Sequence, residues 1–463
     1  MHTLLINGIE EWNKNEDFSF SRESFFPPRK SDERELRLIL QAPNTLVSDN
    51  HSVLPPFSPS LSSSPASSTA TTENPKMNKL CRQVSIESPG QVIKNCVFNF
   101  FVPIQDTPPM GARVKIVCAG ACYRRRDRSA SITSMSSVSS DLGDYCPSMS
   151  APPPVQTSPA HQGIREGSLF PGFEVAGVIE SLGAEINETN NCGLRIGQRV
   201  IVYPFDEAPG GYAEVMAVPE LQYIVPIPDT LSMAVAAMLP TGALLAMNAV
   251  FQAHTVVTRI MKARADDGEP EQKCKILIVG TGGLALWAVR IASYHFACTG
   301  ANNLVDITVA SLRDEGFRLA TEIENVGVVQ WNECLYEPQL IERTKNVCGG
   351  PVDVVIDFGT TSRSLHRSMH CLSKGGIVLI SEDVAEKLMP KFSRLCTEYK
   401  QEIVPISDGS VKQLEDLVQL VADKKIEPPP HSVFPCEEAA EVIQKLCSSE
   451  IPGRAILRFH DIE

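Results

Sequence analysis

Residues 273–296 read KCKILIVGTGGLALWAVRIASYHF. The apolar run Ile276–Val279 predicts a strand that ends in a cluster of glycines. Apolar side chains then recur with the spacing of one helix face, at Leu284, Trp287, Ala288, Ile291 and Ala292. Strand, tight turn and helix follow one another here, as they do in the first unit of a parallel α/β sheet.

The glycine cluster predicts a dinucleotide site, because Gly280, Gly282 and Ala285 fill the three small positions of G-x-G-x-x-G/A. Gly280 permits the turn, Gly282 lets the backbone approach a pyrophosphate, and Ala285 lets the helix pack closely on the strand. Gly283 and Leu284 begin a helix whose free N–H groups and positive dipole end suit a phosphate. The alternative is a glycine turn in another kind of α/β domain.

Composition limits the classes of protein to which the chain can belong. Its 463 residues allow two or three domains, and its net charge of −13 disfavours a nucleic-acid or acidic-membrane binder. No apolar stretch is long enough to span a bilayer, and the first residues show no targeting pattern. The 14 cysteines include no C-x-x-C motif. We therefore expect a reduced, cytoplasmic protein that binds a small-molecule substrate, and neither nucleic acid nor membrane.

Two polar segments interrupt the apolar patterning. Residues 1–78 are rich in Ser, Pro and Thr, and residues 126–165 are dominated by Ser and Pro. Both bury too little apolar surface to offset the entropy of ordering, so we predict that they are disordered. The rest of the first half predicts a small β-barrel or sandwich. Its short predicted strands are residues 95–102, 113–119, 174–181, 198–204, 211–218 and 222–225.

Beyond residue 273, predicted strands and helices alternate. The strands are 306–310, 327–330, 352–358, 376–381 and 402–406. The helices are 314–322, 338–347, 362–372 and 411–423. This order predicts an α/β fold with a doubly wound parallel sheet. The tail, with a helix at 437–446 and a strand at 454–459, is expected to return to the first domain.

Taken in order, these features resemble the medium-chain dehydrogenase/reductase superfamily, which includes alcohol dehydrogenases and quinone reductases. Besides the glycine turn, the matching stretches are Val114–Cys122, Phe170–Gly183, Arg195–Pro204, Gly210–Asp229, Met238–Ala249, Val352–Asp357 and Lys374–Ile380. The resemblance implies a GroES-like substrate domain over 79–245 and a Rossmann domain over 246–428, with 429–463 returning to the substrate domain. It also implies an active site in the cleft between the two domains.

The chain departs from the family pattern at the zinc ligands. Cys122 and Glu174 stand at positions that match ligands of zinc-dependent members. Phe173, however, replaces the expected His, and Thr241 replaces the expected second Cys or acid. Residues 203–210 also lack the cysteines that bind structural zinc in the family. Because zinc needs three protein ligands, we predict that no catalytic zinc binds, and we interpret Cys122 as a small buried hydrophobe.

Without zinc as a Lewis acid, the resemblance implies reduction of a quinone, an enone or another activated carbonyl compound. A protein group or water must then protonate or hydrogen-bond the enolate oxygen. Tyr123 follows Cys122 where the family places active-site residues, and Thr241 begins the helix that should face the nicotinamide. We assign both as candidate catalytic residues, with Tyr123 as proton donor or oxyanion partner. The alternative for Tyr123 is a packing role or an outward orientation.

The end of the second Rossmann strand indicates the choice of cofactor. NAD-specific members place an acid there to bond both ribose hydroxyls. In this sequence the position is Ser311, and Arg313 follows two residues later. Ser311 and Arg313 could bind a 2′-phosphate, so we predict NADP(H) over NAD(H). The alternative is that Arg313 is a solvated surface charge.

Two other hypotheses are kept open. Residues 124–131, RRRDRSAS, place arginines before serines at the start of the polar insertion. A phosphate added there would pair with these arginines, so the insertion is a candidate site for a kinase or a docking partner. Together with the lost zinc site, this supports a catalytically inactive, dinucleotide-binding regulatory protein. The other hypothesis is a zinc-type alcohol dehydrogenase with unusual ligands. A homodimer is also left open.

Overall fold

The computed structural model describes residues 80–86, 96–121, 174–205 and 210–461, with short gaps at 269–271, 281, 302, 312–313, 332–334, 360, 448–449 and 452. All of these residues belong to Asn78–Glu463, one of the two units into which the chain divides. The segments predicted to be disordered, 1–78 and 126–165, lie outside the described residues. So do Cys122, Tyr123, Arg124, Phe173 and Arg313.

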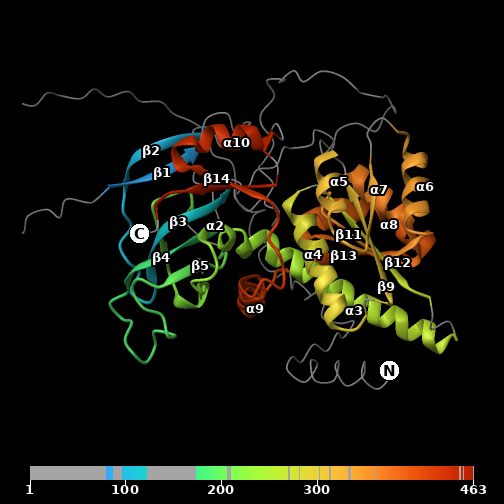
Figure 1. Ribbon diagram of the computed structural model, residues 1–463, viewed down its shortest axis with the longest axis horizontal. Coiled ribbons are helices and arrows are strands. Elements are labelled where there is room, and N and C mark those ends of the chain that lie inside the picture. The colour runs from blue at the N-terminus through green and yellow to red at the C-terminus, as the bar shows by residue number, and fades with distance from the viewer. Residues whose placement is uncertain are drawn as a thin grey trace, which may run out of the picture. The chain divides into compact units, whose positions relative to one another are not determined.

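Six strands form one parallel sheet in the order β10-β9-β8-β11-β12-β13 (Figure 1). They are β8 Cys274–Val279, β9 Val305–Ser311, β10 Val326–Gln330, β11 Val352–Asp357, β12 Leu372–Ser381 and β13 Glu402–Ile406. The strand order reverses between β8 and β11, which pair directly. Ligands of such sheets bind at this switch point, outside the carboxyl ends of the strands. The predicted doubly wound parallel sheet is confirmed.

Helices cover both faces of this sheet, because successive side chains of a strand point to opposite sides. Ile276 and Ile278 of β8 pack in a core with α3, α4 and α9. Leu277 and Val279 of the same strand pack in another core, with α7 and α8. The helices of this region are α3 Leu244–Asp266, α4 Gly283–Cys298, α5 Asp314–Thr321, α6 Glu337–Val347, α7 Ser362–Cys371, α8 Glu382–Tyr399 and α9 Val411–Ala422.

A second sheet has the order β14-β15-β3-β4-β5-β7, with β6 also paired to β3. Its strands are β3 Ala112–Ala121, β4 Val175–Leu182, β5 Arg199–Val202, β6 Val215–Val218, β7 Ile224–Pro226, β14 His431–Pro435 and β15 Arg454–Arg458. β15 runs antiparallel to β3, with Leu457 opposite Ala119. Strands from distant parts of the chain therefore share one sheet, and their apolar side chains fill one core.

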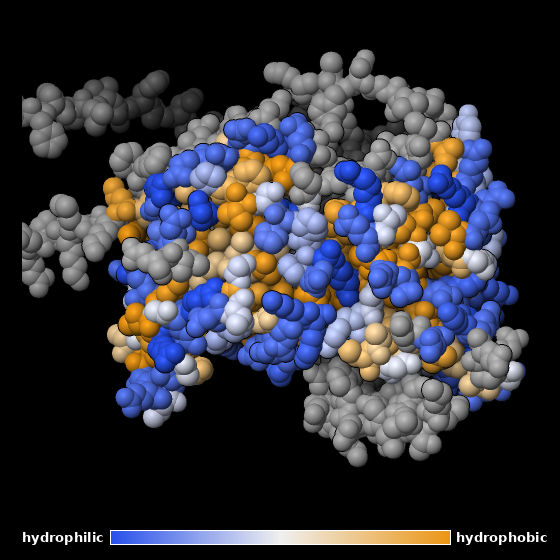
Figure 2. Space-filling model, in the orientation of Figure 1, coloured by the Kyte–Doolittle hydropathy of each residue, from blue (hydrophilic) through white to orange (hydrophobic). Residues whose placement is uncertain are grey.

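Smaller elements complete the described part. β1 Leu80–Ile86 and β2 Cys96–Pro103 form an antiparallel pair. The short helical elements are η4 Leu221–Tyr223, α2 Met233–Ala236, η5 Leu239–Ala243, η6 Cys436–Glu438 and α10 Ala439–Cys447. Hydrophilic residues, with apolar ones between them, cover much of the face in Figure 2. Within the described ranges, no helix combines the length and the apolar character that crossing a membrane requires.

Several segments differ from the sequence prediction; the predicted strand 211–218, for example, is a strand only from Val215 onward. No element is predicted over 382–399, where α8 forms despite Pro390 in its interior, because Leu388 and neighbouring apolar residues are buried on one face. β14 is also unpredicted; it lies at the edge of its sheet, where its terminal proline is tolerated. The predicted strand 222–225 is wrong in its first half, which is the 3₁₀ turn η4, and its second half begins β7.

Candidate cofactor and active site

The glycine turn connects β8 to α4 at the switch point of the parallel sheet. Gly280 has a φ of +152°, and a Cβ on it would lie 3.2 Å from the Cβ of Ala285 and 3.4 Å from that of Phe358. Strand and helix therefore approach each other closely here, as the small residues at Gly280 and Ala285 predict. Its neighbour Gly282 precedes α4, and a Cβ there would meet no described atom within 4 Å.

The open side of the turn suits a phosphate group. Gly282 is the N-cap of α4, and no side chain caps the helix at this residue. Its backbone is extended, a conformation that any residue can adopt without strain. The absence of a side chain at Gly282 therefore matters because it leaves space outside the turn. The first N–H groups of a helix without a side-chain cap, at its positive dipole end, are well suited to bind an anion. The turn therefore fits a dinucleotide pyrophosphate.

Arg454 lies against this turn. A Cβ added to Gly283 would be 2.5 Å from Cδ of Arg454, so glycine at this position makes room for the arginine side chain. Arg454 is the first residue of β15, in the other sheet. The structure thus places a cationic side chain from the second sheet beside the start of α4. Sequence reasoning did not identify Arg454.

A buried carboxylate connects Arg454 to Thr241. Glu174 stands immediately before β4 and is only 2% exposed. Its Oε2 forms an ion pair with Arg454 Nη2. Its Oε1 accepts hydrogen bonds from the Thr241 hydroxyl and, at 3.3 Å, from the backbone N–H of Gly242. A buried carboxylate requires such partners, and here each oxygen has at least one.

The backbone around Thr241 explains how its hydroxyl reaches Glu174. Thr241 lies in η5, a π-helical turn that precedes the long helix α3. Single π-turns of this kind recur at functional sites. A Cβ on Gly242 would lie 3.5 Å from Glu174 Oε1 and 3.6 Å from Cδ2 of Leu284. The structure therefore brings the Thr241 turn and the glycine turn together, although about 40 residues separate them in sequence.

The described residues at the expected zinc positions do not fit a zinc site. Glu174 already shares its oxygens among a hydroxyl, a backbone N–H and a guanidinium, and Thr241 donates its proton to that carboxylate. Zinc is held by thiolate, imidazole or carboxylate groups. Within the described ranges, no three His, Cys, Asp or Glu residues are grouped so that they could hold a metal ion. Cys122 and Phe173 lie outside those ranges.

Ser311 is placed at the carboxyl end of β9, next to β8. Its side chain is almost fully buried, at 1% exposure, and its carbonyl oxygen accepts a hydrogen bond of 2.7 Å from Trp331 N–H. Arg313, its predicted partner in binding a 2′-phosphate, lies outside the described residues, as does Tyr123. The preference for NADP(H) and the role of Tyr123 stay predictions from the sequence.

Asp357 was also missed by sequence reasoning. It ends β11, is 2% exposed, and accepts hydrogen bonds from Ser364 Oγ at 2.9 Å, Ser368 Oγ at 2.8 Å and Gly359 N–H at 2.6 Å. These bonds fix the loop that carries Phe358 beside Gly280. The signal was present, because an acid ends an apolar strand and serines follow at helical spacing.

Comparisons with known proteins agree with this architecture. Residues 109–229 match the family described as alcohol dehydrogenase GroES-like domain, and residues 334–457 match the family described as zinc-binding dehydrogenase. A zinc-type alcohol dehydrogenase-like protein of Schizosaccharomyces pombe is 25% identical over 316 residues, 63% of this chain and 82% of that protein. A quinone oxidoreductase of Mus musculus is 28% identical over 214 residues, 45% of this chain and 54% of its own.

Solved structures show the same fold. The structure of an acetophenone reductase from Geotrichum candidum in complex with NAD covers 83% of this chain and 99% of its own, with a TM-score of 0.54. Its sequence is 14% identical to this chain, so the likeness concerns the fold alone.

Proposed function

The chain belongs to the medium-chain dehydrogenase/reductase superfamily of oxidoreductases, and we propose that it acts without zinc, uses NADP(H) and reduces a quinone, an enone or another activated carbonyl compound. The similarity to a quinone oxidoreductase supports this class of substrate. We also propose that the protein is cytoplasmic, as its cysteine usage predicts.

The observation that carries the proposal is the set of bonds around Glu174. In this site a guanidinium and a hydroxyl occupy the oxygens that a metal ion would need. A zinc ion would also stand close to the positive charge of Arg454. We therefore derive no step through zinc. The substrates best suited to a site without a Lewis acid have a conjugated acceptor, since delocalisation already stabilises the negative charge that develops on the oxygen.

The glycine turn and its surroundings would hold the dinucleotide. The backbone N–H groups of Gly283 and Leu284 and the side chain of Arg454 would face the pyrophosphate. Ser311 and Arg313 would distinguish the 2′-phosphate from a free hydroxyl. When bound, the nicotinamide supplies a hydride. The chain contributes the orientation of substrate and cofactor and the proton or hydrogen bond at the acceptor oxygen.

In this scheme the hydroxyl of Thr241 has a defined hydrogen-bonding orientation. Its proton is directed at Glu174, so toward a substrate the hydroxyl presents an acceptor. To donate to a developing oxyanion, the hydroxyl must turn away from Glu174. Arg454 and the N–H of Gly242 would then still hold the carboxylate. Tyr123 remains the proposed proton donor or oxyanion partner.

Titration with NADPH, followed by fluorescence, tests the cofactor site. A Cβ at Gly282 would meet no described atom within 4 Å and the backbone there is extended, so Gly282→Val should lower the urea unfolding free energy by no more than about 1 kcal/mol, the cost of a poorer N-cap. The same side chain would block the approach of a pyrophosphate to the backbone, and NADPH binding should be lost. Unchanged affinity in Gly282→Val would mean that the turn has a structural role alone.

Turnover on a panel of quinones, enones and aldehydes then tests the reaction. Oxidation of NADPH with a quinone or an enone is expected. The alternative of a catalytically inactive regulatory protein is favoured by one observation, the 5% exposure of Thr241 with its proton bound to Glu174. Tight NADPH binding without turnover on any member of the panel would contradict the enzyme and support that alternative.

A further inference from the structure

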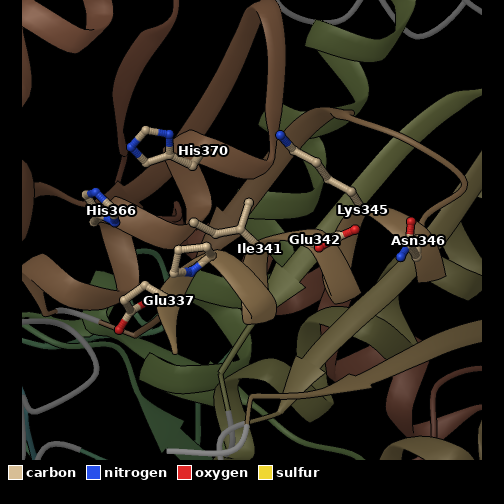
Figure 3. Close-up of a pocket in the computed structure, with 8 residues that line it drawn as sticks. Glu337, Ile341, Glu342, Lys345, Asn346, His366 and His370 are labelled. Atoms are coloured by element: carbon tan, nitrogen blue, oxygen red, sulfur yellow. The ribbon is translucent and has the colours of Figure 1, made fainter. Parts of the chain in front are cut away.

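A groove between α6 and α7 lies apart from the glycine turn and shares no residue with it. Its cavity has a volume of about 550 Å³. Ile341, Glu342, Lys345 and Asn346 line it from α6, and His366 and His370 line it from α7 (Figure 3). None of these side chains takes part in the mechanism proposed above. The groove is therefore a candidate for a separate binding site.

The two histidines are the chemically distinctive part of this groove. His366 and His370 are four residues apart on α7, so they lie on one helix face, and their ring centroids are 4.4 Å apart. Both side chains are half-buried, and neither ring makes a hydrogen bond to any described residue. Two histidines at this spacing on a helix are a recurrent ligand pair for divalent transition metals.

The carboxylates of Glu337 and Glu342 also line the groove. Glu337 binds Arg363 and Arg367; although burial raises its pKa, these hydrogen bonds lower it to about 2. Glu337 is thus an ionised and already paired group at one end of the groove. Glu342 is exposed on the α6 side and carries a second negative charge.

An anionic ligand is the main competitor, because Lys345 carries a positive charge beside the histidines. Lys345 and His370, however, lie in the last turns of α6 and α7, where the helix dipoles present their negative ends. The dipole ends and the carboxylate of Glu342 favour a cation at this end of the groove. The two imidazole rings favour a metal ion over an organic cation, because ring nitrogens are ligands for divalent transition metals.

We propose that His366 and His370 bind a divalent transition-metal ion of the nickel or copper class, with water completing its coordination. Imidazole suits these metals, whereas magnesium and calcium prefer oxygen ligands. Two protein ligands leave the remaining positions open, so the ion exchanges freely and differs from a structural zinc held by four ligands. This site is independent of the proposed reductase activity.

Calorimetric titration of the untagged full-length chain with Ni²⁺ tests the proposal, using His366→Gln and His370→Gln. Mutating residues that only hydrogen-bond to a metal ligand typically lowers metal affinity about 10–100-fold. Removing a ligand should cost at least as much, so we expect each variant to bind Ni²⁺ at least about tenfold more weakly than the wild type. Melting temperatures without Ni²⁺ should match the wild type, which shows that the variants fold. Ni²⁺ should raise the melting temperature of the wild type and not of the variants, because it binds the folded state.

Two control variants distinguish a metal site in the groove from binding elsewhere and from an anion site. His431→Gln changes a histidine outside the groove and should leave Ni²⁺ affinity unchanged. Lys345→Met removes the nearby cation and should preserve or strengthen Ni²⁺ binding; for an anion site, the same change would abolish binding of inorganic phosphate. Wild-type Ni²⁺ affinity in both His366→Gln and His370→Gln would overturn the proposal, as would phosphate binding that depends on Lys345 in place of Ni²⁺ binding.

Discussion

Replacing Arg454 with methionine is expected to destabilise the fold by about 3–5 kcal/mol, the cost of breaking a buried ion pair by removing one partner. The side chains of Arg454 and Glu174 are 12% and 2% exposed. Methionine keeps much of the length of the arginine stem but leaves Glu174 without its counter-ion. The hydrogen bonds from Thr241 and Gly242 remain and do not neutralise the charge.

A second substitution identifies the cause of that loss. Glu174→Gln removes the buried charge while keeping an oxygen that accepts from Thr241. The double variant Glu174→Gln with Arg454→Met should therefore be more stable than Arg454→Met alone. Arg458, on the same strand, is the matched control, because its ion pair with Asp461 is 3.4 Å long and its side chain is 51% exposed. Arg458→Met should cost about 0–1 kcal/mol.

Urea unfolding followed by circular dichroism measures these differences, provided that the variants keep the same m-value. The reasoning would be refuted if Arg454→Met cost no more than Arg458→Met. It would also be refuted if the double variant were as unstable as Arg454→Met. Either result would mean that Glu174 and Arg454 do not form a buried pair.

Three further predictions concern pH and cofactor choice. Burial, and then the charge of His254, lower the pKa of His295 to about 4, so the unfolded chain binds more protons below about pH 6.5. The contribution of His295 to the free energy of unfolding is fully present above that pH and falls by up to about 3 kcal/mol as the pH drops to 4. Between pH 7 and pH 4.5, the urea unfolding free energy of His295→Leu should therefore fall less than that of the wild type. An equal fall in both proteins would contradict the lowered pKa of His295. Arg313→Ala should weaken NADPH binding about 10- to 150-fold and leave NADH binding unchanged, because it removes one charge-assisted hydrogen bond to the 2′-phosphate. Fluorescence titration measures both affinities. Equal weakening of NADPH and NADH binding would refute a contact between Arg313 and the 2′-phosphate. Ser311→Asp should reverse the preference in the same assay, but the burial of Ser311 means that the added carboxylate will also lower stability.

The glycine turn could be predicted because its determinants are local. A buried strand, three small residues and an amphipathic helix lie within 24 residues. The alternation of strands and helices likewise predicts the parallel sheet. α8 was missed because Pro390 interrupts its pattern, and packing of its apolar face on the sheet overrides that local signal.

The ion pair of Glu174 and Arg454 could not be predicted from the sequence. The two residues are 280 positions apart, and only the return of β15 to the sheet of β3 brings them together. The sequence also does not show that the Thr241 hydroxyl points at Glu174. Resemblance located both positions at the expected zinc site, but the contacts that occupy the carboxylate depend on tertiary structure.

The central claim is that the chain transfers hydride from NADPH to an activated acceptor without zinc. The most direct test is NADPH oxidation with a quinone by the full-length chain after dialysis against EDTA, with the zinc content of the same sample measured by elemental analysis. We predict far less than one zinc per chain and an unchanged rate. A stoichiometric zinc, with oxidation lost on its removal and restored on its return, would contradict the account.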